Sequence, residues 1–258
     1  CGKKSDPQYQ GSIINFTKRD FEEINKIIND ESQNYILPPF PDTSIFYKKK
    51  DTKNIFKQKF SYNFNIPEDT PWILTVGMMR DDNAKLESYE ILSKSMELLK
   101  QKYSLLIVGD GPKRAHVERK LKKAIDNKVF MLGEISPIDL VNLYNCCDIF
   151  AWPGVNEAFG LSYLEAQACG LPVVAGNSGG VSEIIKKNKT GLLVDISNNN
   201  PLKFTNALNK LLSDENFRYN MSIEAENFIH TDRNLETTAE KLQNILLNVL
   251  NNYKNLNK

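Results

Sequence analysis

Two glutamates with seven residues between them are the strongest chemical signal in the sequence. Glu157 and Glu165 flank the run Ala158-Phe159-Gly160-Leu161, which is expected to open a helix. The first N–H groups of a helix have no partner within it and its start carries partial positive charge, so a phosphate fits there. Carboxylates accept hydrogen bonds from sugar hydroxyls. Taken alone, the pair could also be two ordinary surface glutamates.

The spacing of the pair suggests the shape of a ligand. Glu157 is expected just before the helix start and Glu165 eight residues further on, which at the helical rise of 1.5 Å per residue gives a span of about 12 Å. Such a span suits an elongated molecule with a diphosphate in the middle and a hydroxyl-rich ring at each end.

Two cations follow the first apolar run of the central pattern. In the segment Val76–Lys85, Gly77 permits a tight exit from a strand, and Arg80 and Lys85 can reach back over the strand end. Two fixed cations can neutralise a diphosphate and the charge that develops on it as a leaving group. Solvated loop charges are the alternative. The neighbouring Asp81-Asp82 pair has no second carboxylate cluster to support it, so we expect no metal.

Two glycine-containing turns also follow apolar runs. Gly109-Asp110-Gly111-Pro112 lacks the full dinucleotide-binding spacing and could equally be a tight strand–helix connection. The segment 176–183 contains three glycines and is expected to shape a pocket rather than to do chemistry.

Short apolar runs alternate with helical patterns from Trp72 onward. This alternation predicts an α/β fold with a doubly wound, Rossmann-like parallel sheet covered on both faces, followed by a helical C-terminal tail at 201–256. Ligands of such sheets bind beyond the carboxyl ends of the strands, where the motifs above lie. The expected strands are Trp72–Val76, Ser104–Val108, Val129–Leu132, Asp148–Trp152, Pro172–Ala175 and Gly191–Val194, and the expected helices lie at about 86–100, 113–126, 136–145, 160–169 and 180–187.

Composition excludes several classes of protein. The 258 residues carry a net charge of +1, which argues against a dedicated nucleic-acid binder. No apolar run approaches the ~18 residues that a membrane span needs. Four cysteines and two histidines show no metal-type spacing, so we expect reduced thiols in a cytoplasmic protein. The basic stretch Lys113–Lys123 could touch anionic lipid, although such runs are usually solvated.

Taken together, these segments resemble the nucleotide-sugar-binding half of a two-domain (GT-B) retaining glycosyltransferase of the "glycosyl transferases group 1" (family 4) type. The resemblance runs in order from about residue 72 to 230. Each motif is weak, whereas the ordered set is highly specific. It comprises Arg80…Lys85, Gly109-Asp110-Gly111-Pro112, Val129–Gly133, Glu157…Glu165, Ala168–Val174, Gly179-Gly180 and Thr190–Leu193.

The resemblance implies a role for each matching residue. Arg80 and Lys85 would bind the donor diphosphate, Glu157 the donor sugar, and Glu165 the ribose hydroxyls. Arg80, Lys85 and Glu157 are thus the expected catalytic residues. This chain departs from the family at Arg80, because two methionines intervene here between the strand-end glycine and the arginine. The remaining donor-binding residues implied are the backbone of Ala158, Phe159, Gly160 and Leu161, the backbone near Met131 beside the nucleobase, and Gly109 and Gly111.

The resemblance also implies an organisation and partners. Residues 1–45 would be a remnant of an N-terminal acceptor domain, 46–70 a connector, 71–230 the nucleotide-sugar-binding domain and 231–258 a cross-over helix. The donor would be a nucleotide sugar, used without a cofactor or metal, and the acceptor an unknown glycan, lipid or small molecule. The chain then looks like a piece of a longer protein whose N-terminal domain is missing.

Two other functions remain open at this point. The chain could be a nucleotide-sugar-binding module that is inactive alone and is completed by another polypeptide. It could instead be a different doubly wound enzyme, such as a nicotinamide-dependent one, although the incomplete dinucleotide fingerprint counts against this.

Overall fold

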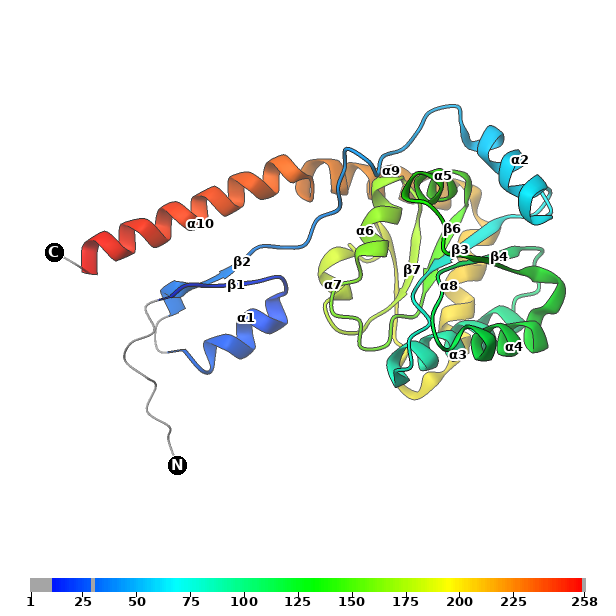
Figure 1. The fold of residues 1–258 in the computed structure, drawn as a ribbon, viewed down its shortest axis with the longest axis horizontal. Coiled ribbons are helices and arrows are strands. Elements are labelled where there is room, and N and C mark those ends of the chain that lie inside the picture. Colours follow the sequence, from blue (N-terminus) through cyan, green and yellow to red (C-terminus); the bar gives the residue numbers. More distant parts are fainter. Residues whose placement is uncertain (1–10, 29–30, 257–258) are drawn as a thin grey trace.

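A six-stranded parallel sheet forms the centre of the molecule (Figure 1). The computed structural model describes residues 11–28 and 31–256. The strand order is β5-β4-β3-β6-β7-β8, and all neighbours run parallel. The predicted doubly wound sheet is therefore confirmed. Its strands are β3 (Trp72–Val76), β4 (Ser104–Val108), β5 (Val129–Gly133), β6 (Ile149–Trp152), β7 (Val173–Gly176) and β8 (Gly191–Val194).

Helices cover both faces of this sheet. The chain winds outward from β3 to β5 and then outward in the other direction from β6 to β8, so right-handed crossovers place the helices of the two halves on opposite faces. Helix α3 packs against α4 and α8, whereas α2 packs against α5 and α6 against α9. The helices of this region are α2 (Lys53–Phe64), α3 (Asn83–Glu97), α4 (Arg114–Ile125), α5 (Pro137–Cys146), α6 (Leu161–Ala168), α7 (Val181–Ile184), α8 (Pro201–Ser213) and α9 (Glu215–Asp232).

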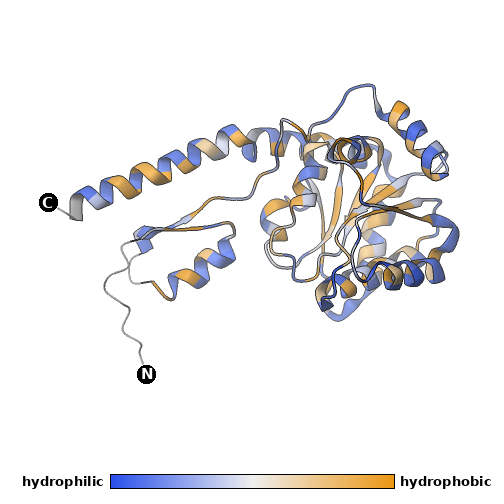
Figure 2. Cartoon of the chain, viewed as in Figure 1, coloured by the Kyte–Doolittle hydropathy of each residue, from blue (hydrophilic) through white to orange (hydrophobic). Residues whose placement is uncertain are grey.

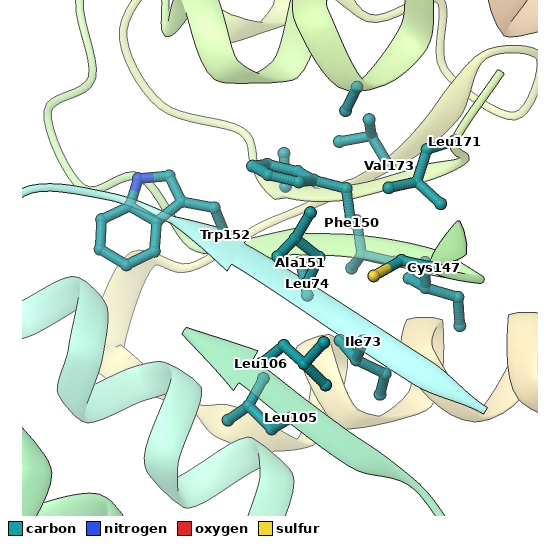
Figure 3. Packing of buried hydrophobic residues seen from close by; sticks show 14 of the residues in the cluster. Ile73, Leu74, Leu105, Leu106, Cys147, Phe150, Ala151, Trp152, Leu171 and Val173 are labelled. Carbon is teal, nitrogen blue, oxygen red and sulfur yellow. The ribbon is translucent and has the colours of Figure 1, made fainter. Parts of the chain in front are cut away.

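The core lies between the central strands and the helices. Leu74, Leu106 and Phe150 lie in register on strands β3, β4 and β6, are fully buried, and face the same side of the sheet (Figure 3). Ile73, also fully buried, faces the other side. Strands that are buried on both faces need nearly continuous apolar sequence, which is why these runs were recognisable. The cysteines Cys146, Cys147 and Cys169 are buried free thiols, and Cys1 lies outside the described residues.

Two helix predictions need correction. Helix α3 begins at Asn83 rather than at 86, because the Asp82 carboxylate caps it by accepting a hydrogen bond from the Lys85 N–H at 2.8 Å. Helix α7 was predicted over 180–187 but covers one turn only, since Ile185 already has extended backbone angles.

A small separate unit precedes the sheet domain. Strands β1 (Ile13–Asn15) and β2 (Asn34–Ile36) pair in parallel, and α1 (Lys18–Asn25) connects them. Both carboxylate oxygens of Glu183 accept a hydrogen bond from the Lys18 N–H at the start of α1, at 2.8 and 2.7 Å. This contact joins the unit to α7. Residues 1–10, which the sequence also assigned to an N-terminal remnant, lie outside the described residues.

The C-terminal tail is helical, as predicted. Its last helix, α10 (Leu235–Leu256), extends away from the sheet on the side of β1, β2 and α1 (Figure 1). Apolar and polar residues alternate along it (Figure 2). Three short 3-10 turns, η1 (Glu31–Gln33), η2 (Asp126–Lys128) and η3 (Ser197–Asn199), complete the described structure.

Candidate functional site

The site lies where the winding of the sheet changes direction. Strands β3 and β6 are neighbours, and from them the chain moves toward opposite edges of the sheet. The loops that leave such a pair of strands diverge and open a crevice at the carboxyl edge, where ligands of doubly wound folds bind. The loop after β3 leads to Lys85, and the loop after β6 carries Glu157.

Lys85 and Glu157 form an ion pair across this crevice. The Lys85 Nζ lies 2.8 Å from the Glu157 Oε2, and the two side chains are 22% and 19% exposed. The Trp152 Nε1–H donates to the same oxygen at 3.4 Å, and the Lys85 ammonium lies 5.4 Å from the centre of the Trp152 ring. Tyr89 packs edge-on against that ring at 4.8 Å. The sequence predicted both charged residues but gave no sign that Trp152 would hold them.

Arg80 lies on the loop that leads into α3 and Lys85, and its side chain contacts less of the protein. Its side chain is exposed, and within residues 11–28 and 31–256 it makes no ion pair or hydrogen bond. The methionines that precede it have separate roles, because Met79 is fully buried while Met78 is 43% exposed. The buried Met79 anchors the loop, the Arg80 side chain is exposed, and its contact with a donor remains a prediction.

Gly109 and Gly111 pack one loop against another. The Met79 N–H donates to the Asp110 carbonyl at 2.9 Å, and the Lys113 N–H donates to the Met79 carbonyl at 3.0 Å. Gly109 has φ +133°, and a Cβ there would stand 2.1 Å from the Gly77 carbonyl oxygen. These glycines therefore allow the loops after β3 and β4 to meet, and their contact with a donor remains a prediction.

The start of α6 is open to a ligand. Gly160 is its N-cap and offers no side-chain hydrogen bond. Among the described residues, the main-chain N–H groups of residues 158–161 find no acceptor. The helix begins at Leu161, so Glu157 lies just before it, and the spacing of about 12 Å between the two carboxylates remains a prediction. The open helix start itself agrees with the expectation from the sequence.

Glu165 lies one turn inside α6 and has a different neighbour. The Tyr144 hydroxyl of α5 donates to the Glu165 Oε2 at 3.0 Å. Burial raises the pKa of the Glu165 carboxyl, while the hydrogen bond from Tyr144 acts in the opposite direction. Burial also raises the pKa of the Tyr144 phenol, which therefore stays protonated and able to donate near neutral pH. The contact with Tyr144 was not predicted.

A cleft of about 420 Å³ separates the small N-terminal unit from the sheet domain beside Glu157. The backbone of the β7–α7 loop forms one wall, since the Gly180 N–H donates to the Ala158 carbonyl at 2.9 Å. Gly179 has φ +57°, and a Cβ there would meet the Glu157 carbonyl oxygen at 1.9 Å, so this wall requires glycine. The cleft is lined by Thr17, Arg19, Asp20, Glu23, Asn156, Glu157, Ala158, Gly179 and Gly180.

The remaining predicted residues lie around this arrangement. Phe159 contacts Phe16 of the N-terminal unit, with ring centres 5.8 Å apart. Met131 is half-buried in β5 and lines a separate hollow of about 230 Å³ with residues of α2 and α4. The structure thus joins Lys85, Glu157 and the start of α6, places Arg80 on the adjoining loop, and places Met131 beside a separate hollow.

Within the described part of the chain, no group of three His, Cys, Asp or Glu side chains is placed to hold a metal ion. Over the same residues, none of the helices combines the length and apolarity that crossing a bilayer requires.

Known proteins with similar sequences or structures were then compared with this chain. It is 26% identical over 213 residues to the D-inositol 3-phosphate glycosyltransferase of Xylanimonas cellulosilytica, which covers 80% of this chain and 50% of the relative. It is 34% identical over 197 residues to the enzyme of the same name from Corynebacterium jeikeium, covering 72% of this chain and 45% of the relative. The chain therefore spans about half the length of these curated relatives.

A solved structure and a family model complete the comparison. The Anabaena protein Alr3699/HepE, solved in complex with UDP-glucose, superimposes with a TM-score of 0.77 at 17% identity, over 92% of this chain and 63% of that one. The model of the family described as "Glycosyl transferases group 1" matches residues 56–228. The chain therefore belongs to the glycosyl transferases group 1 family, and its sheet domain is one half of a GT-B fold.

Proposed function

We propose that this chain supplies the donor-binding half of a glycosyltransferase that moves a sugar from a nucleoside-diphosphate sugar to an acceptor with retention of configuration. The observation that carries the proposal is the meeting of Lys85, Glu157 and the open start of α6 at the crevice between β3 and β6. A cation, an acceptor of hydroxyl hydrogen bonds and unpaired N–H groups are the groups that an activated sugar needs.

Each residue has a distinct task in this proposal. Lys85 and Arg80 neutralise the diphosphate and the charge that grows on it as the bond to the sugar breaks. The free N–H groups at the start of α6 donate to the same phosphates. Glu157 accepts hydrogen bonds from the sugar and Glu165 from the ribose. The ion pair with Glu157 keeps the Lys85 ammonium at the crevice until the diphosphate replaces the carboxylate as its partner.

The comparisons support a nucleotide sugar as the ligand. The Anabaena protein with the same fold was solved with UDP-glucose, and the curated relatives are named as glycosyltransferases. The base and sugar used here, and the acceptor, are left to experiment.

Binding of a nucleoside diphosphate tests the proposal. UDP, GDP and ADP are screened by thermal shift, because a ligand of the folded state raises the melting temperature by mass action. The tightest one is then measured by calorimetry with Arg80→Ala and Glu165→Ala. We expect Arg80→Ala to lower the affinity for the nucleoside diphosphate more than the affinity for the corresponding nucleoside. Glu165→Ala is expected to lower both affinities. A wild-type chain that binds none of the three would contradict the proposal.

A second candidate follows from the length of the chain. Because it spans about half of its curated relatives, it could bind the donor without turning it over until another polypeptide supplies the acceptor side. Donor hydrolysis or transfer by this chain alone favours the first candidate, whereas binding without turnover favours the second.

A further inference from the structure

Tyr144 is packed in the core with its hydroxyl directed at Glu165. The side chain is only 1% exposed at the end of α5. Its ring packs edge-on against Phe46 and is tilted against Phe150, each with centres 6.0 Å away. The hydroxyl lies 3.0 Å from the Glu165 Oε2 and 3.5 Å from the Ser162 carbonyl oxygen. A ring held on both sides leaves the hydroxyl little freedom to turn away from the carboxylate.

The hydrogen bond from Tyr144 uses only one of the two carboxylate oxygens of Glu165. Within residues 11–28 and 31–256, the second carboxylate oxygen of Glu165, Oε1, accepts no hydrogen bond. Tyr144 therefore occupies one oxygen and leaves the other for a ligand. The phenol donates to the ionised carboxylate and so stabilises the form of Glu165 that can accept from two hydroxyls at once.

Few other charged or titratable groups act on this carboxylate. Tyr144 faces it from α5, and the Cys169 thiol lies on the residue that caps the end of α6. Burial raises the pKa of that thiol, so it stays neutral near physiological pH and adds no charge beside Glu165. Lys49 acts on Cys169 rather than on Glu165. Burial, which raises the pKa of Glu165, and the hydrogen bond from Tyr144, which lowers it, are therefore the influences on which the proposal rests.

We propose that Tyr144 is a positioning residue for donor binding, which holds the Glu165 carboxylate ionised and oriented through its hydroxyl. This role rests on the proposed function of the site. It differs from a packing role because only the hydroxyl is needed, so Tyr144→Phe keeps the ring and removes the effect.

The first measurement needs no ligand. The carboxyl carbon of Glu165 is followed by ¹³C NMR from pH 3 to 8 and assigned by its loss in Glu165→Gln. Removal of the hydroxyl withdraws a hydrogen bond from the charged form, so we expect the apparent pKa in Tyr144→Phe to rise by about one unit. Tyr103→Phe is the matched control, because its hydroxyl donates to the Met96 carbonyl on the far side of the fold.

The second measurement reads the pH dependence of binding. Affinity for the nucleoside diphosphate that binds tightest among UDP, GDP and ADP is measured from pH 5 to 8. We expect the affinity to fall as Glu165 takes up a proton. Because the pKa of Glu165 is expected to be higher in Tyr144→Phe, the pH at which affinity falls should also be higher in that variant, but not in Tyr103→Phe. Titration of the diphosphate itself is the same for all three chains and cancels in the comparison.

The outcomes separate the two proposals. If the wild type binds a nucleoside diphosphate and Tyr144→Phe shows the same midpoints as the wild type, the inference about Tyr144 is wrong and the proposed function stands. If the wild type binds none, the proposed function fails and the positioning role fails with it. If Tyr144→Phe does not fold, the ¹³Cζ resonance of Tyr144 is followed in the wild type instead. The proposal requires this resonance to titrate with the midpoint of Glu165, and a resonance that does not shift at that pH would overturn it.

Discussion

Lys85 lies at a position where a positive charge lowers the stability of the helix. It lies in the first turn of α3, where the helix carries partial positive charge and a cation is disfavoured. Glu157 offsets this cost in the free protein through the ion pair at 2.8 Å. A cation held at an unfavourable position by a replaceable partner is a reasonable arrangement for binding an anion.

The consequence is a test that separates binding from stability. We expect Lys85→Met to lower the affinity for a nucleoside diphosphate roughly 10- to 100-fold, as befits the loss of a hydrogen bond between charged groups. The free energy of unfolding should change by less than about 1 kcal/mol, because partly exposed ion pairs contribute little. Calorimetry and urea unfolding measure the two quantities. Lys59→Met, which breaks the exposed pair of Lys59 with Asp139, is the control, and equal affinities in both variants would refute the role.

The charged residues of the site were predictable and their aromatic partners were not. Lys85, Glu157 and Glu165 follow apolar runs in motifs that suggest a function. Trp152 and Tyr144 look like core residues in the sequence, and they are core residues that also donate one hydrogen bond each. Tyr144 lies 21 positions from Glu165, so only the tertiary fold brings them together. No pattern within a short stretch of sequence predicts such a contact.

At the level of elements, strands were easier to predict than helix ends. Three strands, β3, β4 and β8, have the predicted bounds, since a buried parallel strand ends where apolar sequence ends. Helix ends depend on individual capping contacts. The carboxylate of Asp82 begins α3 three residues early, and this places Lys85 in the first turn instead of in a loop. Asp is a common N-cap, so this signal was present in the sequence.

The cap of α3 by Asp82 is therefore expected to affect both the stability of the fold and the binding of a ligand by Lys85. A variant that removes the cap of another helix separates these two effects. We expect Asp82→Ala to cost about 1 kcal/mol of folding free energy, because the Lys85 N–H loses its acceptor. It should also weaken nucleoside diphosphate binding, since Lys85 is no longer held in the first turn. Asp214→Ala removes the equivalent cap of α9, where the Asp214 carboxylate accepts from the Phe217 N–H, away from the crevice. Urea unfolding should show similar losses for both variants, and similar losses of affinity would contradict this account.

At the scale of the whole molecule, two parts differ in how well they are packed. The sheet domain has continuous buried apolar strands, whereas β1 and β2 are three-residue strands joined to it by the Glu183–Lys18 contact and by Phe16 against Phe159. The last helix, α10, also has both buried and exposed apolar residues along its length. Ile245 of α10 is buried, but Leu246, Leu247 and Leu250 are each about half exposed.

This difference predicts two levels of stability within one chain. We expect the amides of β3, β4 and β6 to exchange with solvent only on global unfolding, and those of β1 and β2 through cheaper local opening. Leu106→Ala, which truncates a fully buried side chain of β4, should lower the free energy of unfolding by about 2–5 kcal/mol. Hydrogen exchange should then accelerate throughout the sheet while β1 and β2 keep their wild-type rates. Ile27→Ala, at a side chain 75% exposed, is the control and should leave both sets unchanged. If Leu106→Ala accelerates β1 and β2 as much as the sheet, the two parts unfold together and the small N-terminal unit is bound far more tightly than its few contacts indicate.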